Sequence, residues 1–499
     1  MARGPAVVSN RSMSLSAASV TVGTGPISFT DVTAVARRDA PVVLDPGALA
    51  GVEATRRIID GLAQDADPHY GISTGFGALA TTFITADRRA QLQASLVRSH
   101  AAGSGPEVER EVVRALMLLR LSTLMTGRTG VRPKTAETYA ALLNAGITPV
   151  VHEYGSLGCS GDLAPLAHCA LALMGEGQVR DRAGTLMSGG DALAAAGIAP
   201  VVLAEKEGLA LINGTDGMLG MLILALDDLA RLLTTADIAA AMSVEALLGT
   251  DAVFAADLQA LRPQLGQAAS AANLRGLLDG SPLLASHAGP AIRAAWLASA
   301  VDNPVVTLDG RVESNGNFHG APVGYVLDFL AIAAADVASM SERRTDRHLD
   351  VSRNKGLPPF LAHEVGVDSG LMIAQYTAAG IVSELKRLAV PASVDSIASS
   401  AMQEDHVSMG WAAARKLRRS IDGLGRVVAI EIMTASRSLD LRAPLLPGPA
   451  TAAVRDLVRT VAEGPGHDRF LSPEIEAIVG LVGSGAVRDA AAGVVGTLH

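Results

Sequence analysis

The sequence predicts a mainly α-helical protein built around a bundle of long helices, with a small mixed region on its N-terminal side. Apolar residues recur at helical spacing over long runs, and strand patterns do not alternate with them as in a doubly wound sheet. Hydrophobic residues make up 49% of the 499 residues, whereas aromatic residues make up only 3%. The expected core is therefore aliphatic, which suits closely packed helices.

The expected elements follow from these runs in chain order. In the N-terminal part, helices are predicted at 52–62, 87–100, 107–126 and 135–143. The longest helices are predicted at 217–248, 323–347, 369–388 and 411–439. Short valine-rich pieces are candidate strands, at 6–8, 20–22, 42–44 and 305–308.

These runs divide the chain into four expected segments. They are a loose N-terminal leader (1–30), an N-terminal region (31–216), a central long-helix bundle (217–440) and peripheral helices at the C-terminal end (441–499). The leader lacks the sustained apolar stretch of a signal peptide.

Composition excludes several classes of function. The net charge is −9, and no cluster of Lys and Arg is large enough to predict binding to nucleic acid. No uninterrupted apolar run of about 18 residues predicts a membrane span. The two cysteines, Cys159 and Cys169, cannot form a disulfide framework, which favours a cytoplasmic location. The histidines lack zinc-binding spacing, so no metal is expected.

The most informative motif is the run 155–168, GSLGCSGDLAPLAH. Its triplet Cys159-Ser160-Gly161 can cyclise in a tight turn. The amide nitrogen of Gly161 attacks the carbonyl carbon of Cys159, and loss of water closes a five-membered imidazolone. Ser160 then loses its hydroxyl and leaves an exocyclic methylene. Glycine suits the third position because it adopts compressed backbone angles and leaves its nitrogen unobstructed. The product is an electrophile made from backbone.

The residues around the triplet strengthen this interpretation. Asp162 can orient protons during the dehydrations, and Pro165 fits the first turn of a helix. A lone Ser-Gly pair is usually only a turn. The whole run, however, resembles the signature of the histidine/phenylalanine ammonia-lyase family, whose prosthetic group is 4-methylideneimidazol-5-one (MIO). That family often has Ala at the first triplet position. Cys159 keeps the chemistry possible because its side chain lies outside the new ring bonds.

The resemblance extends over about residues 32–441 and carries further expectations. It implies an ammonia-lyase/fumarase-like helical bundle with the MIO loop in the N-terminal region. It also implies a homotetramer whose active sites combine residues from three chains. The run 69–77, HYGISTGFG, reads alone as a glycine-rich turn. It resembles the family's YGxxTGFG loop, which implies that Tyr70 is catalytic. Cationic groups or helix N-termini would then lower its ordinary pKa of about 10.

Two positions point to the same substrate. A His at a helix end is often only a dipole partner, but Ser99-His100 resembles the dipeptide of family members that act on histidine. His100 would hydrogen-bond the substrate imidazole. Glu404, in the run QEDHVSMG at 403–410, matches the histidine-specific form of another family motif. A carboxylate can pair with an imidazole N–H, whereas an apolar ring would leave its charge unpaired. The expected substrate is L-histidine.

Two further motifs complete the expected site. Asn213, in GLALINGT at 208–215, is either a helix cap or an active-site amide; the resemblance implies the latter, with the imidazolone or the substrate carboxylate as its partner. The run NGNFHG at 315–320 reads alone as a turn. The resemblance implies that Asn317 and Phe318 lie beside the prosthetic group, with Phe318 packing on the bound ring. Residues 341–344, SERR, form an expected buried ionic node of structural role.

One family motif has no counterpart in the chain. Family members carry a QDxYSxR segment whose Tyr and Arg serve catalysis and carboxylate binding, but residues 286–302 contain no Tyr and run directly into the next motif. The expected activity is deamination of L-histidine to trans-urocanate and ammonia, by attack of MIO on either the amine or the ring. The alternatives are a lyase or aminomutase for another aromatic amino acid, and a catalytically impaired helical homologue.

Overall fold

The structure is a computed structural model, and it describes most of the chain. The described residues are 18–75, 83–156, 161–248, 251, 254–260, 265–281, 283, 305–306, 312–313, 319–365, 367–399, 404 and 406–498. Among the predicted features, the candidate strand at 6–8 and the site residues Cys159, Ser160, Asn317 and Phe318 lie outside these residues.

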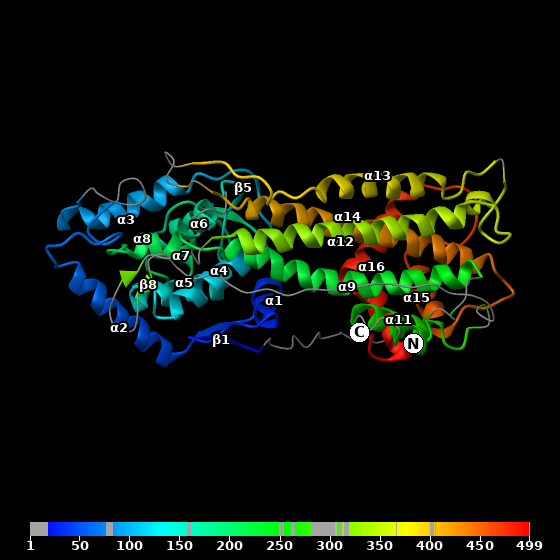
Figure 1. Ribbon diagram of the computed structural model, residues 1–499, viewed down its shortest axis with the longest axis horizontal. Coiled ribbons are helices and arrows are strands. Elements are labelled where there is room, and N and C mark those ends of the chain that lie inside the picture. Colours follow the sequence, from blue (N-terminus) through cyan, green and yellow to red (C-terminus); the bar gives the residue numbers. More distant parts are fainter. Residues whose placement is uncertain are drawn as a thin grey trace, which may run out of the picture.

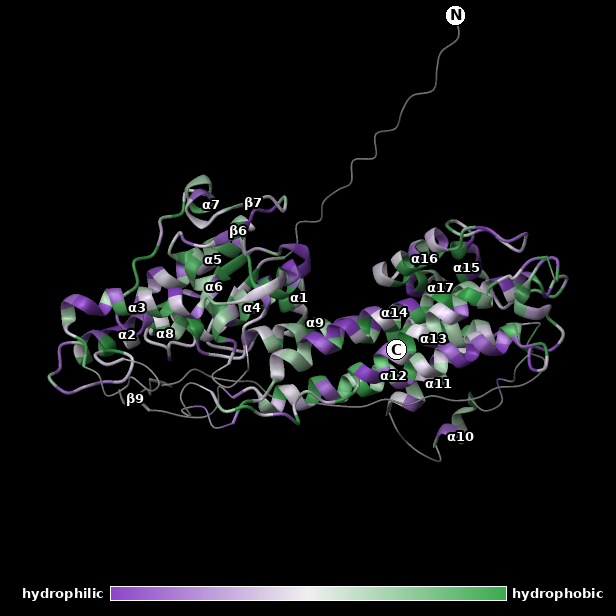
Figure 2. Cartoon of the chain, turned by 90° about the horizontal axis from the view of Figure 1, so that it is seen from above, coloured by the Kyte–Doolittle hydropathy of each residue, from purple (hydrophilic) through white to green (hydrophobic). Residues whose placement is uncertain are grey.

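The molecule is elongated, with a compact N-terminal region at one end and long helices over the rest of its length (Figure 1). The long helices are α9 (Asp216–Ala246), α12 (Ala321–Leu349), α13 (Met372–Leu388) and α14 (Gly410–Asp440). α14 packs against α9, α12 and α13. Figure 2 shows apolar and polar residues alternating along these helices, as expected for helices with one buried face. The prediction of a mainly α-helical bundle is confirmed.

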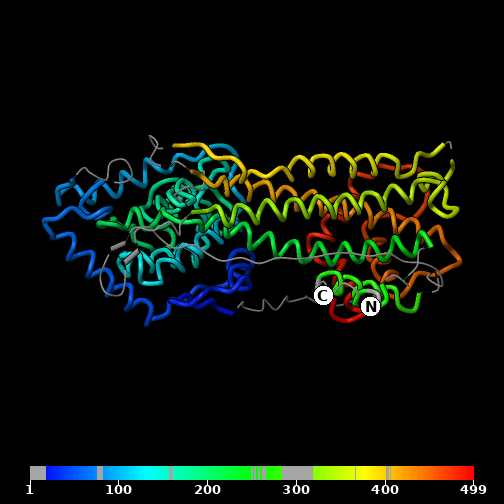
Figure 3. Tube along the Cα trace, in the orientation of Figure 1, coloured from blue at the N-terminus to red at the C-terminus, as the bar shows by residue number. Residues whose placement is uncertain are grey.

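The C-terminal helices lie on the bundle. They are α15 (Pro449–Val458), α16 (Ser472–Ser484) and α17 (Ala486–Val495). α16 packs against α14, and α15 and α17 contact α11 (Leu265–Leu278). Figure 3 shows this red C-terminal segment beside the green segment that contains α11. The short α10 (Ala256–Ala260) precedes α11, and a 3₁₀ helix, η4 (Pro359–Leu361), lies between α12 and α13.

The N-terminal region combines short helices with small sheets. Its helices are α1 (Phe29–Arg38), α2 (Pro46–Leu62), α3 (Ala86–His100), α4 (Arg110–Met125), α5 (Pro133–Ala145), α6 (Leu163–Leu173), α7 (Gly189–Ala195) and α8 (Glu207–Ile212). Side chains define several of the helix starts. Ser28 and Asp31 form a capping box at α1, and Asp45 caps α2 ahead of Pro46.

The described strands pair in four small sheets. β1 (Val20–Val22) runs parallel to β2 (Val42–Leu44), and β3 (Ser104–Glu107) pairs antiparallel with β5 (His152–Tyr154). β4 (Thr148–Pro149), β6 (Gln178–Arg180) and β7 (Leu186–Ser188) form an antiparallel sheet, and β8 (Val305–Val306) pairs with β9 (Val312–Glu313). β1 lies within the expected leader, so the described fold begins before residue 30.

Most predicted helices agree with the structure to within a few residues, but two starts are wrong. α2 begins at Pro46, well before the predicted start at 52, because Asp45 caps the helix ahead of Pro46 and the apolar period does not mark this start. The run 107–126 was predicted to be helical from its first residue, whereas α4 begins at Arg110. Glu107 instead ends β3, where it pairs with His152. The apolar period does not reveal this strand because the residues of β3, Ser-Gly-Pro-Glu, are neither apolar nor β-branched.

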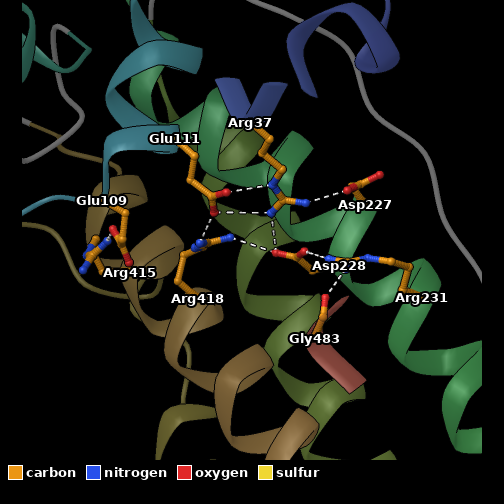
Figure 4. A network of polar contacts seen from close by, with 9 residues as sticks. All are labelled: Arg37, Glu109, Glu111, Asp227, Asp228, Arg231, Arg415, Arg418 and Gly483. Atoms are coloured by element: carbon orange, nitrogen blue, oxygen red, sulfur yellow. Dashed lines mark hydrogen bonds and ion pairs between the residues drawn. The ribbon is translucent and has the colours of Figure 1, made fainter. Parts of the chain in front are cut away.

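Charged side chains join the N-terminal region to the bundle (Figure 4). Arg37 of α1 lies 2.7 Å from Glu111 of α4 and 2.7 Å from Asp228 of α9. Arg418 of α14 also contacts both Glu111 and Asp228, the latter at 2.9 Å. Asp227 adds a third carboxylate to Arg37. Bridging charges of this kind fix how the two parts meet, because each guanidinium binds more than one element.

α12 is long and apolar enough to cross a membrane by length and composition, and half of its most apolar window is buried within the chain. The bent pair α16 and α17 passes the same test together. Mostly buried core helices of globular proteins also pass it. On the exposed side of α12, large apolar residues recur at helical spacing, at Tyr325, Phe329, Ile332 and Met340.

Candidate active site

Gly161 lies directly against the turn that follows α8. Its φ of +78° is in the left-handed region, and a Cβ at this position would overlap the carbonyl oxygen of Gly214. The two glycines form a parallel bridge, and the next amide, that of Asp162, donates to the Gly214 oxygen at 2.6 Å. Only glycine fits such an approach. The structure therefore brings Gly161 next to Asn213, although these residues are far apart in sequence.

Asp162 connects this turn to the start of α9. Its carboxylate accepts hydrogen bonds from the backbone N–H groups of Gly217 and Met218, both at 2.9 Å, and from the Ser156 hydroxyl at 2.9 Å. The side chain is fully buried. Burial raises the pKa of Asp162 to about 7, although these hydrogen bonds act to lower it. The carboxyl therefore sits where proton transfer at neutral pH is chemically accessible.

Asn213 is the C-cap of α8, directly after its last residue, and it is 4% exposed. Its backbone position agrees with the helix-end interpretation, while its burial beside Gly161 agrees with an active-site amide. α8 is held against α3, because the N–H of Gly208 donates to the Gln93 side chain at 2.9 Å. A Cβ on Gly208 would lie 2.9 Å from the Gln93 carbonyl oxygen. α3, which ends at His100, therefore packs on α8, whose C-cap is Asn213.

A buried ion pair packs against the same turn, at Gly214. Arg120, which is 1% exposed, pairs with Asp216 and donates to the Ala210 carbonyl at 3.0 Å. A Cβ on Gly214 would overlap the Arg120 guanidinium. Sequence reasoning missed this pair. The signal was present, because Arg120 interrupts an otherwise apolar helical face within the run 107–126.

The predicted substrate dipeptide lies in the last turn of α3. The Nδ1–H of His100 donates to the Leu96 carbonyl at 2.9 Å, and the Ser99 hydroxyl donates to the same carbonyl at 3.0 Å. Burial lowers the pKa of His100, so the ring is neutral at neutral pH. Since a carbonyl only accepts, Nε2 is the ring atom that carries the lone pair and can accept from a donor.

A second histidine connects α3 to the signature helix α6. His168 Nε2 accepts a hydrogen bond from the backbone N–H of Gly103 at 3.2 Å. Burial and the neighbouring His152, whose ring centroid is 5.5 Å away, lower the pKa of His168 to about 4. The ring is therefore a neutral acceptor over the physiological range. The prediction did not single out His168 for any role.

The starts of three bundle helices meet beside Asp162. The Met218 side chain fills the space that side chains at Gly320 and Gly410 would need, since a Cβ on Gly320 would lie 2.5 Å from its methyl carbon. Gly320 caps α12, and α14 begins at Gly410. The Trp411 indole N–H donates to the Glu153 carbonyl at 2.7 Å, which ties α14 to β5. The N-terminal ends of α9, α12 and α14 thus converge on one place, where their dipoles favour negative charge.

The other predicted residues lie in separate segments. Tyr70 is part of a compact turn in which the amide of Ile72 donates to the His69 carbonyl at 3.1 Å, and its side chain is partly buried against the core. Glu404 forms an antiparallel bridge with Ser399. The hydrogen bonds that join Gly161, Asp162 and Gly214 to α9 involve neither Tyr70 nor Glu404. Within the part of the chain that the structure describes, no three His, Cys, Asp or Glu residues are placed to hold a metal ion.

Comparisons with known proteins place the chain among enzymes. Residues 27–296 and 291–460 match the family described as aromatic amino acid lyase. A histidine ammonia-lyase from Streptomyces avermitilis is 60% identical, with 96% of this chain and 99% of that protein covered. One from Sorangium cellulosum is 46% identical over 95% and 99%, respectively.

Two solved structures share the fold over nearly the full length. A tyrosine aminomutase from Streptomyces globisporus superposes with a TM-score of 0.90 at 33% identity, covering 96% of this chain and 100% of that one. A histidine ammonia-lyase from Trypanosoma cruzi gives a TM-score of 0.86 at 34% identity, covering 95% of each chain.

The comparisons also locate a difference. The family match is split into two parts that meet at residues 291–296. The alignment with the Streptomyces avermitilis protein spans 508 positions, more than the 499 residues of this chain, so part of that relative has no counterpart here. The split falls in the stretch where the QDxYSxR segment was expected. These residues lie outside the described part of the chain.

Proposed function

The chain belongs to the aromatic amino acid lyase family, and we propose that it catalyses the non-oxidative deamination of L-histidine to trans-urocanate and ammonia. One observation carries this proposal: the chain is 60% identical to a histidine ammonia-lyase over nearly the full length of both proteins. The reaction is that of a carbon–nitrogen lyase and takes no external cofactor.

The residues proposed to select the substrate have matching chemistry. His100 is neutral and presents Nε2 as an acceptor, which can receive the N–H of a substrate imidazole. Glu404 supplies a carboxylate that can bind the second ring N–H when the imidazole is protonated. Ser99 positions the dipeptide through its hydrogen bond to Leu96. A phenyl ring offers no donor to either group.

Cys159, Ser160 and Gly161 are proposed to form MIO, and the described surroundings fit that group. Gly161 has a left-handed backbone and no room for a side chain, as the third residue of the cyclised triplet requires. The buried Asp162 carboxyl, with its pKa near 7, can donate and accept protons next to that backbone. When formed, the group supplies an electrophile that makes ammonia easier to remove.

Protein groups around this position can stabilise negative charge. The amides of Gly217 and Met218 show that the start of α9 points at Asp162, and α12 and α14 start beside Met218. Helix N-termini in a buried site stabilise developing negative charge without reorganisation. Asn213 is proposed to bind the substrate carboxylate or the imidazolone, Tyr70 to exchange a proton with the substrate, and Asn317 and Phe318 to contact the reacting group.

We also make proposals for the assembly of the protein and for its location in the cell. We propose a homotetramer with shared active sites. The exposed apolar face of α12, with Tyr325, Phe329 and Ile332, supports it, because an apolar stripe of this length on a monomer is an interaction surface. A cytoplasmic location is supported by the buried free thiol of Cys169.

A second candidate function is a catalytically impaired homologue that keeps the fold. The observation that favours it is the split of the family match at residues 291–296, where an arginine clamp for the substrate carboxylate was expected. An aminomutase is the remaining alternative, supported by the likeness to the tyrosine aminomutase structure. His100 and Glu404 favour histidine over the apolar or phenolic rings of other aromatic amino acids.

The mass of the intact purified protein tests cyclisation. We expect a deficit of two water molecules in the wild type and none in Ser160→Ala. Cys159→Ala serves as the matched control, because it changes a side chain outside the ring bonds and should keep the deficit. A wild-type mass equal to that of the unmodified sequence would overturn the MIO proposal.

Incubation with L-histidine, followed by the near-ultraviolet absorbance of urocanate, tests the activity. We expect wild type and Cys159→Ala to form urocanate and Ser160→Ala to form none above background. A protein that has lost two waters but forms no urocanate would support the impaired homologue. Formation of a β-amino acid from tyrosine or phenylalanine would support the aminomutase.

A further inference from the structure

The segment that carries Glu404 is anchored first to the residues just before it. We call residues 404 and 406–409 the Glu404 loop. The amide of Ser399 donates to the Glu404 carbonyl at 2.9 Å, and the amide of Glu404 donates to the Ser399 carbonyl at 3.2 Å. The amide of Val407 donates to the Ser396 hydroxyl at 3.0 Å. These bonds close the loop on itself but do not fix it relative to other elements.

A third anchor comes from another part of the chain. His319, which directly follows Phe318, approaches the His406 carbonyl with Nε2 at 3.2 Å. Its Nδ1 accepts the backbone N–H of Ala321, the first residue of α12, at 3.3 Å. Since an amide only donates and a carbonyl only accepts, the ring is neutral, with its proton on Nε2. Its plane stacks on that of His406, with a centroid distance of 5.6 Å and an interplanar angle of 12°.

We propose that His319 is a positioning residue for substrate selection, whose Nε2–H fixes the Glu404 loop relative to the start of α12 through the His406 carbonyl. This inference rests on the proposed function. It adds a residue that touches no substrate to the recognition of the imidazole ring. His319 belongs to the segment that leads into α12, and its hydrogen bond reaches the loop that carries Glu404.

The geometry explains why a single hydrogen bond matters here. At this point the backbones of α12 and α14 approach through glycines, because a Cβ on Gly324 would lie 3.3 Å from the Gly410 Cα. Glycines permit close approach but supply no directional side-chain contact. The hydrogen bond from His319 to the His406 carbonyl adds a directional contact between the loop and the start of α12. A carboxylate–imidazole hydrogen bond depends strongly on distance and angle, whereas a phenyl ring makes no such bond with Glu404.

Two substitutions separate the roles of the two ring nitrogens. In His319→Asn the amide oxygen can replace Nδ1 as acceptor for Ala321, but the donor to His406 is lost. In His319→Gln the amide NH₂ can replace Nε2 and keep that donor. His406→Ala is the matched control for stacking, because it removes the ring and keeps the backbone carbonyl. His319→Ala is a second variant without the donor, in case His319→Asn does not accumulate.

The readout is competitive inhibition by trans-urocanate and by trans-cinnamate, which share the acrylate and differ in the ring. The ratio of their inhibition constants does not depend on the fraction of active protein. We expect His319→Asn to raise the inhibition constant of urocanate about tenfold relative to that of cinnamate, which is the equivalent of one hydrogen bond. His319→Gln and His406→Ala should each keep the wild-type ratio within about twofold.

Three results would overturn the inference. The first is that His319→Asn weakens the binding of both inhibitors by the same factor. The second is that His319→Gln changes the ratio of inhibition constants as much as His319→Asn does. The third is that His406→Ala does so, which would assign the effect to the ring stack. Failure of the proposed function gives a different pattern. In that case the wild type itself would neither form urocanate from L-histidine nor prefer urocanate to cinnamate, whatever the variants do.

Discussion

At the end of the bundle next to Gly161, glycines allow α9, α12 and α14 to approach one another closely. At the opposite end, a buried carboxylate and its partners join the same three helices. At the first end, Met218 occupies the space left by Gly320 and Gly410. We call this the site end. Short distances between backbones bring three helix N-termini to one place, where their partial positive charge acts together.

We call the opposite end of the bundle the distal end. There, the carboxylate of Glu431 of α14 accepts hydrogen bonds from side chains of α9 and α12. The Ser243 hydroxyl of α9 and the Ser341 hydroxyl of α12 each donate to its carboxylate at 2.7 Å. Arg344 of α12 donates through Nε at 2.5 Å and through a terminal nitrogen at 2.9 Å. Glu431 is fully buried, so these donors replace its hydration. The predicted buried ionic node at 341–344 is confirmed for Ser341 and Arg344, whereas Arg343 is exposed and pairs with the neighbouring Glu342.

The difference indicates two ways of holding the same three helices. The distal end specifies how the helices align, because a buried carboxylate tolerates only the arrangement that satisfies it. At the site end, glycines let the helix starts approach closely, and ion pairs such as Asp328 with Lys416 join the helices further along. The backbone dipoles of the helix starts and the adjacent loops lie beside the candidate site. A substitution at the distal end should therefore act on stability, and one at the site end on activity first.

The largest expected effect is at Glu431. Glu431→Gln removes the charge that compensates Arg344 and should destabilise the fold by about 3–5 kcal/mol, the usual loss when one partner of a buried ion pair is removed. Chemical denaturation of the purified protein measures it. Residual activity per folded molecule should stay near wild type, because the site end is unchanged.

Two controls sharpen this prediction. Arg344→Met in the Glu431→Gln background removes the unpaired cation and should recover part of the loss, a coupling that a double-mutant cycle measures. Glu384→Gln breaks the exposed pair with Arg387 and should cost no more than about 1 kcal/mol. Equal losses from the buried and the exposed pair would contradict the assigned role of the distal end.

The next effect is expected at Gly410. Gly410→Ala introduces a Cβ that overlaps the Met218 sulfur, and overpacking of this kind costs about 1–3 kcal/mol. It also displaces the start of α14, which follows the Glu404 loop. We therefore expect kcat for L-histidine to fall by more than the stability loss alone explains, measured on the folded fraction. Met218→Ala should restore part of the activity.

Gly425→Ala on the same helix is the matched control. A Cβ there would meet its nearest neighbour, a Leu232 methyl, at an ordinary 3.6 Å. Replacing an interior helical glycine by alanine without a clash stabilises a helix by up to about 1 kcal/mol. If Gly410→Ala behaved like Gly425→Ala, close backbone approach would not be what distinguishes the site end.

The sequence predicted the bundle better than the site because the two depend on different signals. α9 and α14 repeat apolar residues over many turns, so their bounds follow from periodicity alone. At the site end the informative residues are glycines, and a glycine in a sequence does not reveal what its missing side chain makes room for. Gly320 and Gly410 therefore passed without a role.

The motifs predicted the chemistry of the candidate site but not the residues that pack around it and hold it in place. Gly161 and Asn213 were predicted to act together, and the structure brings their segments into contact. Met218 reads as an ordinary core residue of an apolar helix, and His168 as one more scattered histidine. The role of Met218 depends on the glycines of α12 and α14 that face its side chain, and the role of His168 depends on the Gly103 amide. Both arise only when the helices pack together. Local sequence patterns do not contain this information.

The smallest expected effect is the net dependence of stability on pH, because buried groups at the two ends contribute with opposite signs. His348, at the distal end, is fully buried and lies 2.9 Å from the Ser438 hydroxyl. Burial lowers its pKa from 6.5 to about 3. Between these values the unfolded chain binds the proton and the folded chain does not, so stability is lost as pH falls. Asp162, at the site end, has its pKa raised from 3.8 to about 7 by burial. Between those values the folded chain holds the proton, so its contribution is lost as pH rises.

Between pH 3.8 and 6.5 the two contributions therefore oppose each other, each with a slope of about 1.4 kcal/mol per pH unit. Unfolding midpoints across this range should rise more steeply with pH in Asp162→Asn and less steeply, or fall, in His348→Leu. Both variants belong in the Ser160→Ala background, so that cyclisation cannot differ between them. If the two substitutions changed the slope in the same direction, the two ends would not carry buried groups of opposite protonation behaviour, and the contrast between them would reduce to packing.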